Sequence, residues 1–207
     1  MITQLLLQDK PVFTYGKKQI VYAEGNHFNG VYYVLSGKVK TFITNEDGKS
    51  IITDLFTEGD LFGYIPFFKG TNYYDNAVVI HEAQLIFISV KEFEWYFNEK
   101  REFAIHIIQL LAKSICNKEH RILSTAYNSL RKKVAETLLQ VNDKMALVNA
   151  SGCSIKLNRS ILAELAGTAT ESFVRTLSDF QHEKLINIDK EGSISLLNIN
   201  KLKYLPN

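Results

Sequence analysis

The sequence predicts an α+β chain of three parts: an N-terminal β-roll, a long helix and a C-terminal winged helix-turn-helix. Short runs of alternating apolar and polar residues, broken by glycines, fill the first half of the chain. A helical stripe without glycine or proline follows, and near the end two short helix patterns precede a hairpin pattern. We expect the roll to span residues 1–100, the long helix and hinge 101–129, and the helix-turn-helix domain 130–207.

Composition limits the class of protein before any motif does. The chain has 207 residues, of which 46% are hydrophobic and 22% charged, enough for a substantial core in one or two domains. No run approaches the roughly 18 apolar residues of a membrane span, and no basic leader follows Met1. We therefore expect a cytoplasmic protein without a membrane partner. Cys116 and Cys153 lie far apart without metal-ligand spacing, so we expect both to be reduced and structural.

The first half of the chain reads as a β-sandwich or barrel. Glycines punctuate the strand patterns, and residues 35–38 and 45–48 have the composition of hairpin turns. Enclosed β-rolls of this kind often hold a small ligand. The expected strands are residues 20–22, 31–35, 39–43, 51–56, 77–80 and 85–88.

Around Val90 the hydrophobic period changes from two to nearly four. Short helices are expected over 90–97 and 130–141, and a long one over about 103–124. The long helix carries a single apolar stripe, which either packs on its own domain or along a twin helix of a second subunit. We favour the twin helix of a second subunit. A winged helix-turn-helix domain binds more tightly when two copies, related by a two-fold axis, each contact one half-site. The predicted dimer interface is Phe103, Ile107, Leu110, Leu111, Ser114, Ile115 and Ile122.

Two helix starts lie about ten residues apart near the C-terminus. Asn158 and Thr168 are residue types that cap helices, and Glu171 would complete a capping box with Thr168. Gly167 between them allows the left-handed backbone that ends a helix and reverses the chain. The pattern therefore predicts a helix-turn-helix.

The second helix of this pair has an apolar side and a polar side. Arg175 can bond a guanine bidentately, Glu171 can accept from a cytosine amino group, and Thr170 and Ser172 suit phosphates or bases. Alternating residues at 186–188 and 194–196 predict a hairpin, and therefore a wing. The alternative is a small helical subdomain whose polar side is merely solvated. The expected inner residues are Phe173, Val174, Leu177 and Phe180.

The order of β-roll, long helix and winged reader resembles the cyclic AMP receptor protein and fumarate-nitrate regulator (Crp/Fnr) family of bacterial transcription factors. The best local matches are residues 31–39, 58–63 and 158–185. The resemblance implies a cyclic-nucleotide-binding-like, cupin-like double-stranded β-helix, a dimerisation helix, near-palindromic double-stranded DNA as partner, and RNA polymerase as a possible further one.

The resemblance also assigns roles in the reader. It places Thr170, Glu171 and Arg175 at base-reading positions, and Ser172 and Arg159 at phosphates. Thr170 departs from the arginine that many relatives carry there, which puts the preference at that one base step in doubt.

The resembling family's cyclic-nucleotide cassette is degenerate in this chain. Gly63 after Phe62 is kept, but Tyr64 replaces the ribose-binding glutamate, and Asp75-Asn76 replace the phosphate-binding Arg-Ser pair. A cyclic phosphate would meet a carboxylate where it needs a cation, so cyclic AMP and cyclic GMP are disfavoured. The remaining alternatives are a ligand-free roll that supports dimerisation and an unidentified small effector, which we favour. On the long helix, Lys118 and Glu119 stand where the family contacts adenine.

Metal and catalytic chemistry find little support in the sequence. The five histidines show no His-x-His pair or clustered carboxylates, and the N-terminal cysteine group of the family's iron-sulfur sensors is absent. Haem ligation through His81 or His106 is disfavoured, since a lone histidine is usually hydrogen-bonded or exposed. No catalytic constellation occurs, so we expect no enzyme.

The function expected from sequence is a sequence-specific dimeric DNA-binding regulator with a sensor domain. The alternative is a ligand-binding β-roll module whose helical tail serves protein contact without specific DNA binding. A gel-shift against random duplexes separates the two.

Overall fold

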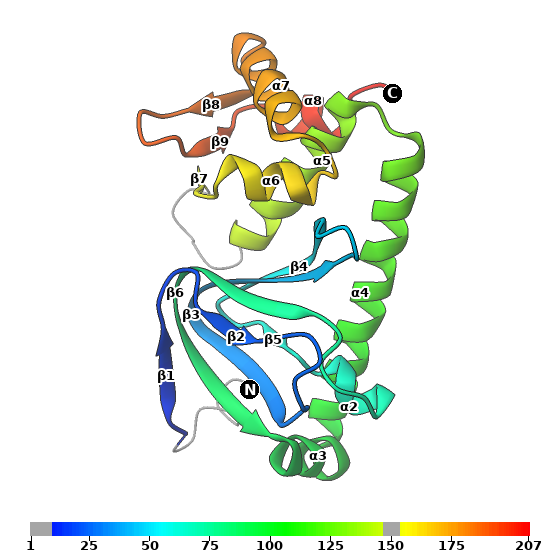
Figure 1. The fold of residues 1–207 in the computed structure, drawn as a ribbon. Coiled ribbons are helices and arrows are strands. Elements are labelled where there is room, and N and C mark those ends of the chain that lie inside the picture. The colour runs from blue at the N-terminus through cyan, green and yellow to red at the C-terminus, as the bar shows by residue number, and fades with distance from the viewer. Residues whose placement is uncertain (1–9, 147–153) are drawn as a thin grey trace. The chain divides into compact units, whose positions relative to one another are not determined.

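Figure 1 shows the computed structural model, which describes residues 10–146 and 154–207. By its internal packing the chain divides into two units, Met1–Ile115 and Cys116–Asn207. The long helix α4 (Arg101–Tyr127) contributes to both. In the two described ranges, no helix combines the length and the hydropathy that a membrane crossing requires. Cys153 lies outside the described residues.

An antiparallel sheet forms the first unit. Its main path runs β1-β6-β3-β4, and in addition β2 pairs with β6 and β5 with β3. Within the described residues the strands are β1 (Val12–Tyr15), β2 (Ile20–Tyr22), β3 (Gly30–Thr44), β4 (Ser50–Thr57), β5 (Leu61–Phe62) and β6 (Asn76–Ser89).

Two pairs of expected strands are in fact two long strands. The predicted turn at 35–38 is wrong, because Gly37 lies inside β3 at a register shift against β6. With φ of +91°, its Cα lies so close to β6 that an added Cβ would stand 2.1 Å from the carbonyl oxygen of Glu82. The glycine thus allows close backbone approach instead of chain reversal. The turn at 45–48 is confirmed: Gly48, with φ of +76°, donates its N–H to the carbonyl of Asn45.

Among the described residues of this unit, three helices accompany the sheet. These are α2 (Ile65–Lys69), α3 (Val90–Glu99) and the first half of α4. The predicted helix at 90–97 is confirmed, and it begins with a capping box in which Ser89 Oγ accepts from the N–H of Glu92. The core between these helices and the sheet contains Val31, Tyr33, Leu61, Tyr64, Ile86, Ile88, Phe93, Phe103 and Ile107.

The second unit combines helices with a small sheet in the order β7-β9-β8. Helix α5 packs against α6, α7 and α8, and Figure 1 shows the β8–β9 hairpin projecting from beside α7. The predicted helix-turn-helix and wing are thus confirmed as local structure. The elements are α5 (Leu130–Ala146), β7 (Ser154–Ile155), α6 (Arg159–Leu165), α7 (Thr170–His182), β8 (Ile186–Ile188), β9 (Ile194–Leu196) and α8 (Ile199–Lys203).

A hydrogen-bond network fixes the end of α4 to the start of α5. The Glu136 carboxylate accepts from Ser124 Oγ at 2.6 Å and from Asn128 Nδ2 at 2.8 Å. Lys133 Nζ also donates to the carbonyl of Thr125 at 2.9 Å. The last turn of α4 and the first turns of α5 are therefore held as one corner.

Candidate nucleic-acid interface

The turn between α6 and α7 is built by one glycine. The Asn158 side chain caps α6 by accepting from the N–H of Ser160 at 3.1 Å, as expected. At the other end Gly167 adopts φ of +64°. Its N–H donates to the carbonyl of Glu164, and the next N–H donates to the carbonyl of Ala163, which together form a Schellman motif. The chain reverses here with its terminal carbonyls satisfied.

The expected capping box of α7 is wrong by one residue. Thr168 is used in the Schellman motif, where its N–H bonds the carbonyl of Ala163. Ala169, with extended φ and ψ, is therefore the N-cap of α7, and no side chain caps this helix end. Glu171 lies in the first turn, where its negative charge faces the positive end of the helix dipole.

The outward side of α7 holds most of the predicted reading residues. Thr170, Glu171 and Arg175 are exposed, and Ser172 is half-buried at the edge of the inner side. Inside, Phe173, Leu177 and Phe180 are buried as predicted.

Val174 was expected inside but is 44% exposed, and Thr176 is buried in its place. Thr176 Oγ1 donates to the carbonyl of Ser172 at 3.0 Å, which satisfies its hydroxyl inside the domain and makes its burial tolerable. Val174 therefore lies on the outward side.

Arg159 connects α6 to the wing. Its Nη2 donates to the carbonyl of Gly192 at 2.7 Å. Partial burial lowers the pKa of the Arg159 guanidinium, and the negative charge of Asp189 opposes this shift. Sequence reasoning proposed Arg159 as a phosphate contact and missed this link, since no local pattern joins positions 33 residues apart. A guanidinium has five N–H donors, so one wing bond leaves others for an anion.

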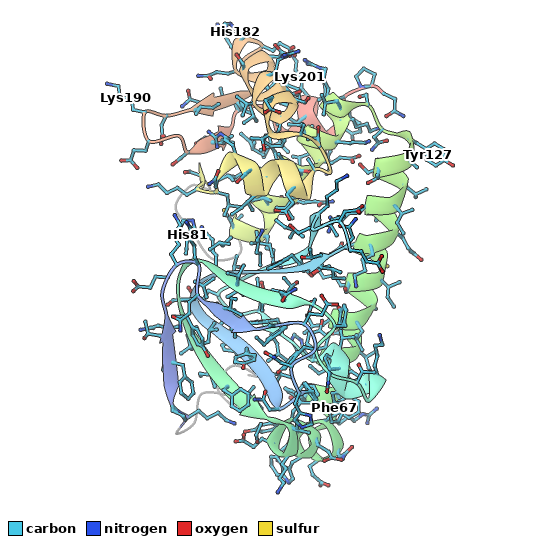
Figure 2. The ribbon with its side chains drawn as sticks, viewed as in Figure 1. Phe67, His81, Tyr127, His182, Lys190 and Lys201 are labelled. Carbon is cyan, nitrogen blue, oxygen red and sulfur yellow. The ribbon has the colours of Figure 1, made fainter. Side chains whose placement is uncertain are left out.

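The tip of the wing is a tight turn organised by Asp189. Its Oδ1 accepts from the N–H groups of Glu191 and Ser193, at 2.9 Å and 2.8 Å. Figure 2 shows Lys190 at this tip and His182 at the far end of α7. The wing therefore ends in an ordered turn that exposes Asp189, Lys190 and Glu191.

An ion pair secures the C-terminal end of α7. Arg131 of α5 donates from Nη2 to both carboxylate oxygens of Glu183 at 2.8 Å. Its guanidinium also lies 4.9 Å from the centroid of the Phe180 ring. These contacts hold α7 against α5, so the outward side of α7 has a defined orientation within its unit.

The predicted dimer interface divides into buried and exposed members. Phe103 and Ile107 are 1% and 0% exposed in the core of the first unit. Their side chains have almost no surface left for a second subunit, so including them in the predicted interface is wrong. Leu110 and Leu111 pack partly against the same core, and Ser114 is half-buried.

Ile115 and Ile122 are exposed, and so is Ile108, which sequence reasoning omitted. Ile108, Ile115 and Ile122 follow one another at intervals of seven residues. They form a row along α4, which we call the isoleucine row. The signal that would have found Ile108 is this seven-residue spacing.

Two of the residues predicted to line the effector pocket are core side chains. Phe62 and Tyr64 are buried, and burial raises the pKa of Tyr64 to about 12, with Asp54 and Asp60 adding to the shift. Above Gly63, a Cβ would stand 3.2 Å from Tyr22 Cε1 and 3.5 Å from Tyr73 Cε1.

Sequence reasoning missed the two tyrosines at this place. The rings of Tyr22 and Tyr73 stack with centroids 3.9 Å apart. The two rings therefore occupy the space that a side chain at position 63 would enter.

The other predicted pocket residues have structural partners or belong to the second unit. Asp75 is buried beside Tyr22. Burial of the Tyr22 hydroxyl, followed by the negative charge of Asp75 and a hydrogen bond between the two side chains, holds the Tyr22 pKa well above its usual range. Asn76 Oδ1 accepts from the N–H of Glu24 at 3.0 Å. Lys118 and Glu119 are exposed on the part of α4 that belongs to the second unit.

Metal and thiol chemistry gain no support from the geometry. Among the residues that the structure describes, no three His, Cys, Asp or Glu side chains gather as a metal site would require. Cys116 is exposed and has a free thiol.

Comparisons with known proteins cover nearly the whole chain. A model of the cyclic nucleotide-binding domain matches residues 12–100, and a model of the Crp-like helix-turn-helix domain matches residues 132–205. The chain is 24% identical to the cAMP-activated global transcriptional regulator CRP of Pasteurella multocida over 179 residues, 85% of each protein. It is also 24% identical to the global nitrogen regulator of a Nostoc species over 184 residues, 87% of this chain and 82% of that protein.

Solved structures show the same fold. FixK2 from Bradyrhizobium japonicum superposes with a TM-score of 0.84 at 21% identity, covering 93% of this chain and 95% of that one. A CRP-family transcriptional regulator from Thermus thermophilus gives 0.74 at 20% identity, covering 92% and 94%.

Proposed function

Because this chain belongs to the Crp/Fnr family of transcription regulators with a helix-turn-helix DNA-binding domain, we propose that it acts as a homodimer reading a near-palindromic operator. The observation that carries the proposal is the outward side of α7, where Thr170, Glu171 and Arg175 are exposed at the N-terminal turns. In a helix-turn-helix these turns enter the major groove and contact base edges. A regulator of this kind works in the cytoplasm, where bacterial DNA lies.

Each side chain has a proposed role that follows from its chemistry. Arg175 bonds the O6 and N7 of a guanine, and Glu171 accepts from a cytosine amino group. Thr170 contacts a base or a phosphate at the groove edge. Ser172 and Arg159 bind phosphates and fix the register of the domain on the duplex. The link from Arg159 to Gly192 supports this role, because it holds the guanidinium beside the wing.

The isoleucine row supports the dimer. A seven-residue apolar repeat is typical of helices that pair along a seam, and each isoleucine leaves more than half of its surface exposed in the single chain. Leu111, half-buried beside Ile108 and Ile115, lies next to this row on α4. Two readers related by a two-fold axis would contact half-sites whose centres lie about ten base pairs apart.

The β-roll is proposed as the sensor of a small effector other than a cyclic nucleotide. Tyr64 and Asp75 supply no cation for a cyclic phosphate, and the tyrosine stack occupies the space above Gly63. Entry of an effector at this place would therefore shift Tyr22 and Tyr73, which would couple binding to the packing of the roll. RNA polymerase is proposed as a further partner on the family resemblance alone.

Selection of bound sequences from random duplex DNA by the full-length protein tests the function. We expect enrichment of a near-palindrome with half-site centres about ten base pairs apart. Lys17→Ala, which removes an exposed positive charge from the roll, is the matched control for substitutions in α7 and should leave the enriched sequence unchanged. Enrichment of a single asymmetric site, or of none, would contradict the proposal.

A further inference from the structure

An apolar side chain lies in the middle of the outward side of α7. Val174 is 44% exposed, whereas Phe173 before it and Leu177 one turn later are 0% and 1% exposed. Since successive helical residues are rotated by about 100°, Val174 projects about 40° from Thr170 and about 60° from Glu171. Arg175 lies about 100° further round on the same outward side. Three exposed polar residues thus surround one exposed valine.

The fold gives no reason for a valine at this position. Its side chain lies outside the apolar core of the second unit, so its packing contributes little to the stability of that unit. Valine is also a poorer helix former than alanine or the long polar residues, because its branched Cβ loses rotamer freedom against the preceding turn. An exposed helical position selected for folding alone would favour another residue. The exposed methyl groups of Val174 are therefore available for contact with a ligand.

The major groove offers one apolar group to such a side chain. Its base edges present hydrogen-bond donors and acceptors, and the C5-methyl of thymine is the exception. We infer that Val174 reads a thymine by packing against its C5-methyl group. This inference rests on the proposed DNA-reading function and specifies part of the sequence that is read.

The position of Val174 also places the thymine in the half-site. Neighbouring Cα atoms are about 3.8 Å apart, close to the rise of about 3.4 Å between base pairs. Val174 and Arg175 are adjacent in the chain but diverge around the helix. The thymine therefore lies within two base pairs of the guanine that Arg175 bonds.

Removing the methyl group from DNA tests the contact directly. The probe is the operator enriched from random duplexes, with each thymine of one half-site replaced in turn by deoxyuridine, which pairs identically but lacks the methyl group. For the wild-type protein we expect about a fourfold loss of affinity at one thymine, which is the factor that burial of one methyl-sized group contributes. The guanine reference is the position at which Arg175→Ala relaxes base preference.

Two variants show whether Val174 senses the methyl group. Val174→Ala should bind the thymine operator about fourfold more weakly per half-site and show no further loss with deoxyuridine. Because the side chain is outside the core, the variant should melt at the wild-type temperature. Leu197→Ala removes another exposed apolar side chain of the same unit, 58% exposed, and should keep the full sensitivity to deoxyuridine.

The outcomes separate this inference from the proposed function. An enriched operator with no methyl-sensitive thymine within two base pairs of the guanine would overturn the inference and leave the proposed function standing. Equal deoxyuridine losses for wild type and Val174→Ala would also overturn it. Failure to enrich any sequence would overturn the proposed function, and the inference with it.

Discussion

The isoleucine row of α4 gives the proposed dimer a quantitative test. Ile108, Ile115 and Ile122 leave 58%, 58% and 69% of their surface exposed. Fully burying an isoleucine contributes about 1.5–3 kcal/mol, so the exposed parts of three residues on two helices amount to about 6–11 kcal/mol. Association costs about 4–15 kcal/mol in lost translational and rotational freedom, so the dimer depends strongly on each member of the row.

Ile115→Lys changes the middle member of this row. It removes the burial of one side chain on each helix, about 2–3.5 kcal/mol in total, which raises the dimer Kd by about 30- to 400-fold. Repulsion between the two new ammonium groups increases the loss. We expect the variant to be monomeric at concentrations where the wild type is dimeric, and to lose operator binding with it.

Sedimentation equilibrium over a concentration series measures the effect. The matched control is Asn117→Lys, which adds the same charge to an exposed position about 200° around the helix from Ile115. The control should sediment as wild type. A wild-type monomer at all concentrations, or an Ile115→Lys dimer as tight as the control, would refute the reasoning.

Four further predictions concern the reader, the pocket and the corner. Arg175→Ala should weaken specific binding by about 1–3 kcal/mol per half-site and relax preference at one base pair, measured by competition against single-base operator variants. Arg159→Ala should weaken all sequences alike and reduce the slope of log K against log salt by about one per half-site; an unchanged slope would exclude a phosphate contact. Calorimetry with cyclic AMP and cyclic GMP should show no binding tighter than about 1 mM, and micromolar binding would overturn our interpretation of the pocket. Glu136→Ala should lower the free energy of unfolding by about 1–3 kcal/mol in calorimetric melts, because it removes the acceptor of Ser124 Oγ and the shorter of two hydrogen bonds donated by Asn128 Nδ2; an unchanged melt would show that the corner does not depend on this carboxylate.

The helix-turn-helix was predictable because its signals are local. Asn158 and Gly167 act on backbone groups within four residues, and such short-range geometry can be read from the chain. The capping error at Thr168 arose where two local motifs compete for one residue, and the Schellman motif takes it. Val174 and Thr176 are separated by about 200° around α7, and hydropathy alone does not show that a threonine whose hydroxyl bonds to its own helix backbone is buried while a valine is exposed.

The roll and its pocket were predictable only in outline. Alternation identified the strands, but Gly37 has the same composition signal in a turn as in a close approach between strands. The tyrosine stack joins β2 to a residue 51 positions later, and no periodicity encodes such a contact. The burial of Phe103 and Ile107 likewise depends on tertiary packing, because an apolar stripe does not specify what covers it.

The seven-residue spacing of the isoleucine row gives the number of residues in α4 a structural consequence. Seven residues of a straight α-helix rotate by about 20° less than two full turns, so two helices paired along a seven-residue repeat would wrap around each other in a left-handed supercoil. Inserting one residue between Ile115 and Ile122 would rotate everything beyond it by about 100° and shift it by about 1.5 Å. The Glu136 network fixes the last turn of α4 to α5, so this rotation would pass into the domain that carries α7. In the proposed dimer, the number of residues in α4 would therefore set both the distance and the direction at which each helix-turn-helix domain meets its half-site.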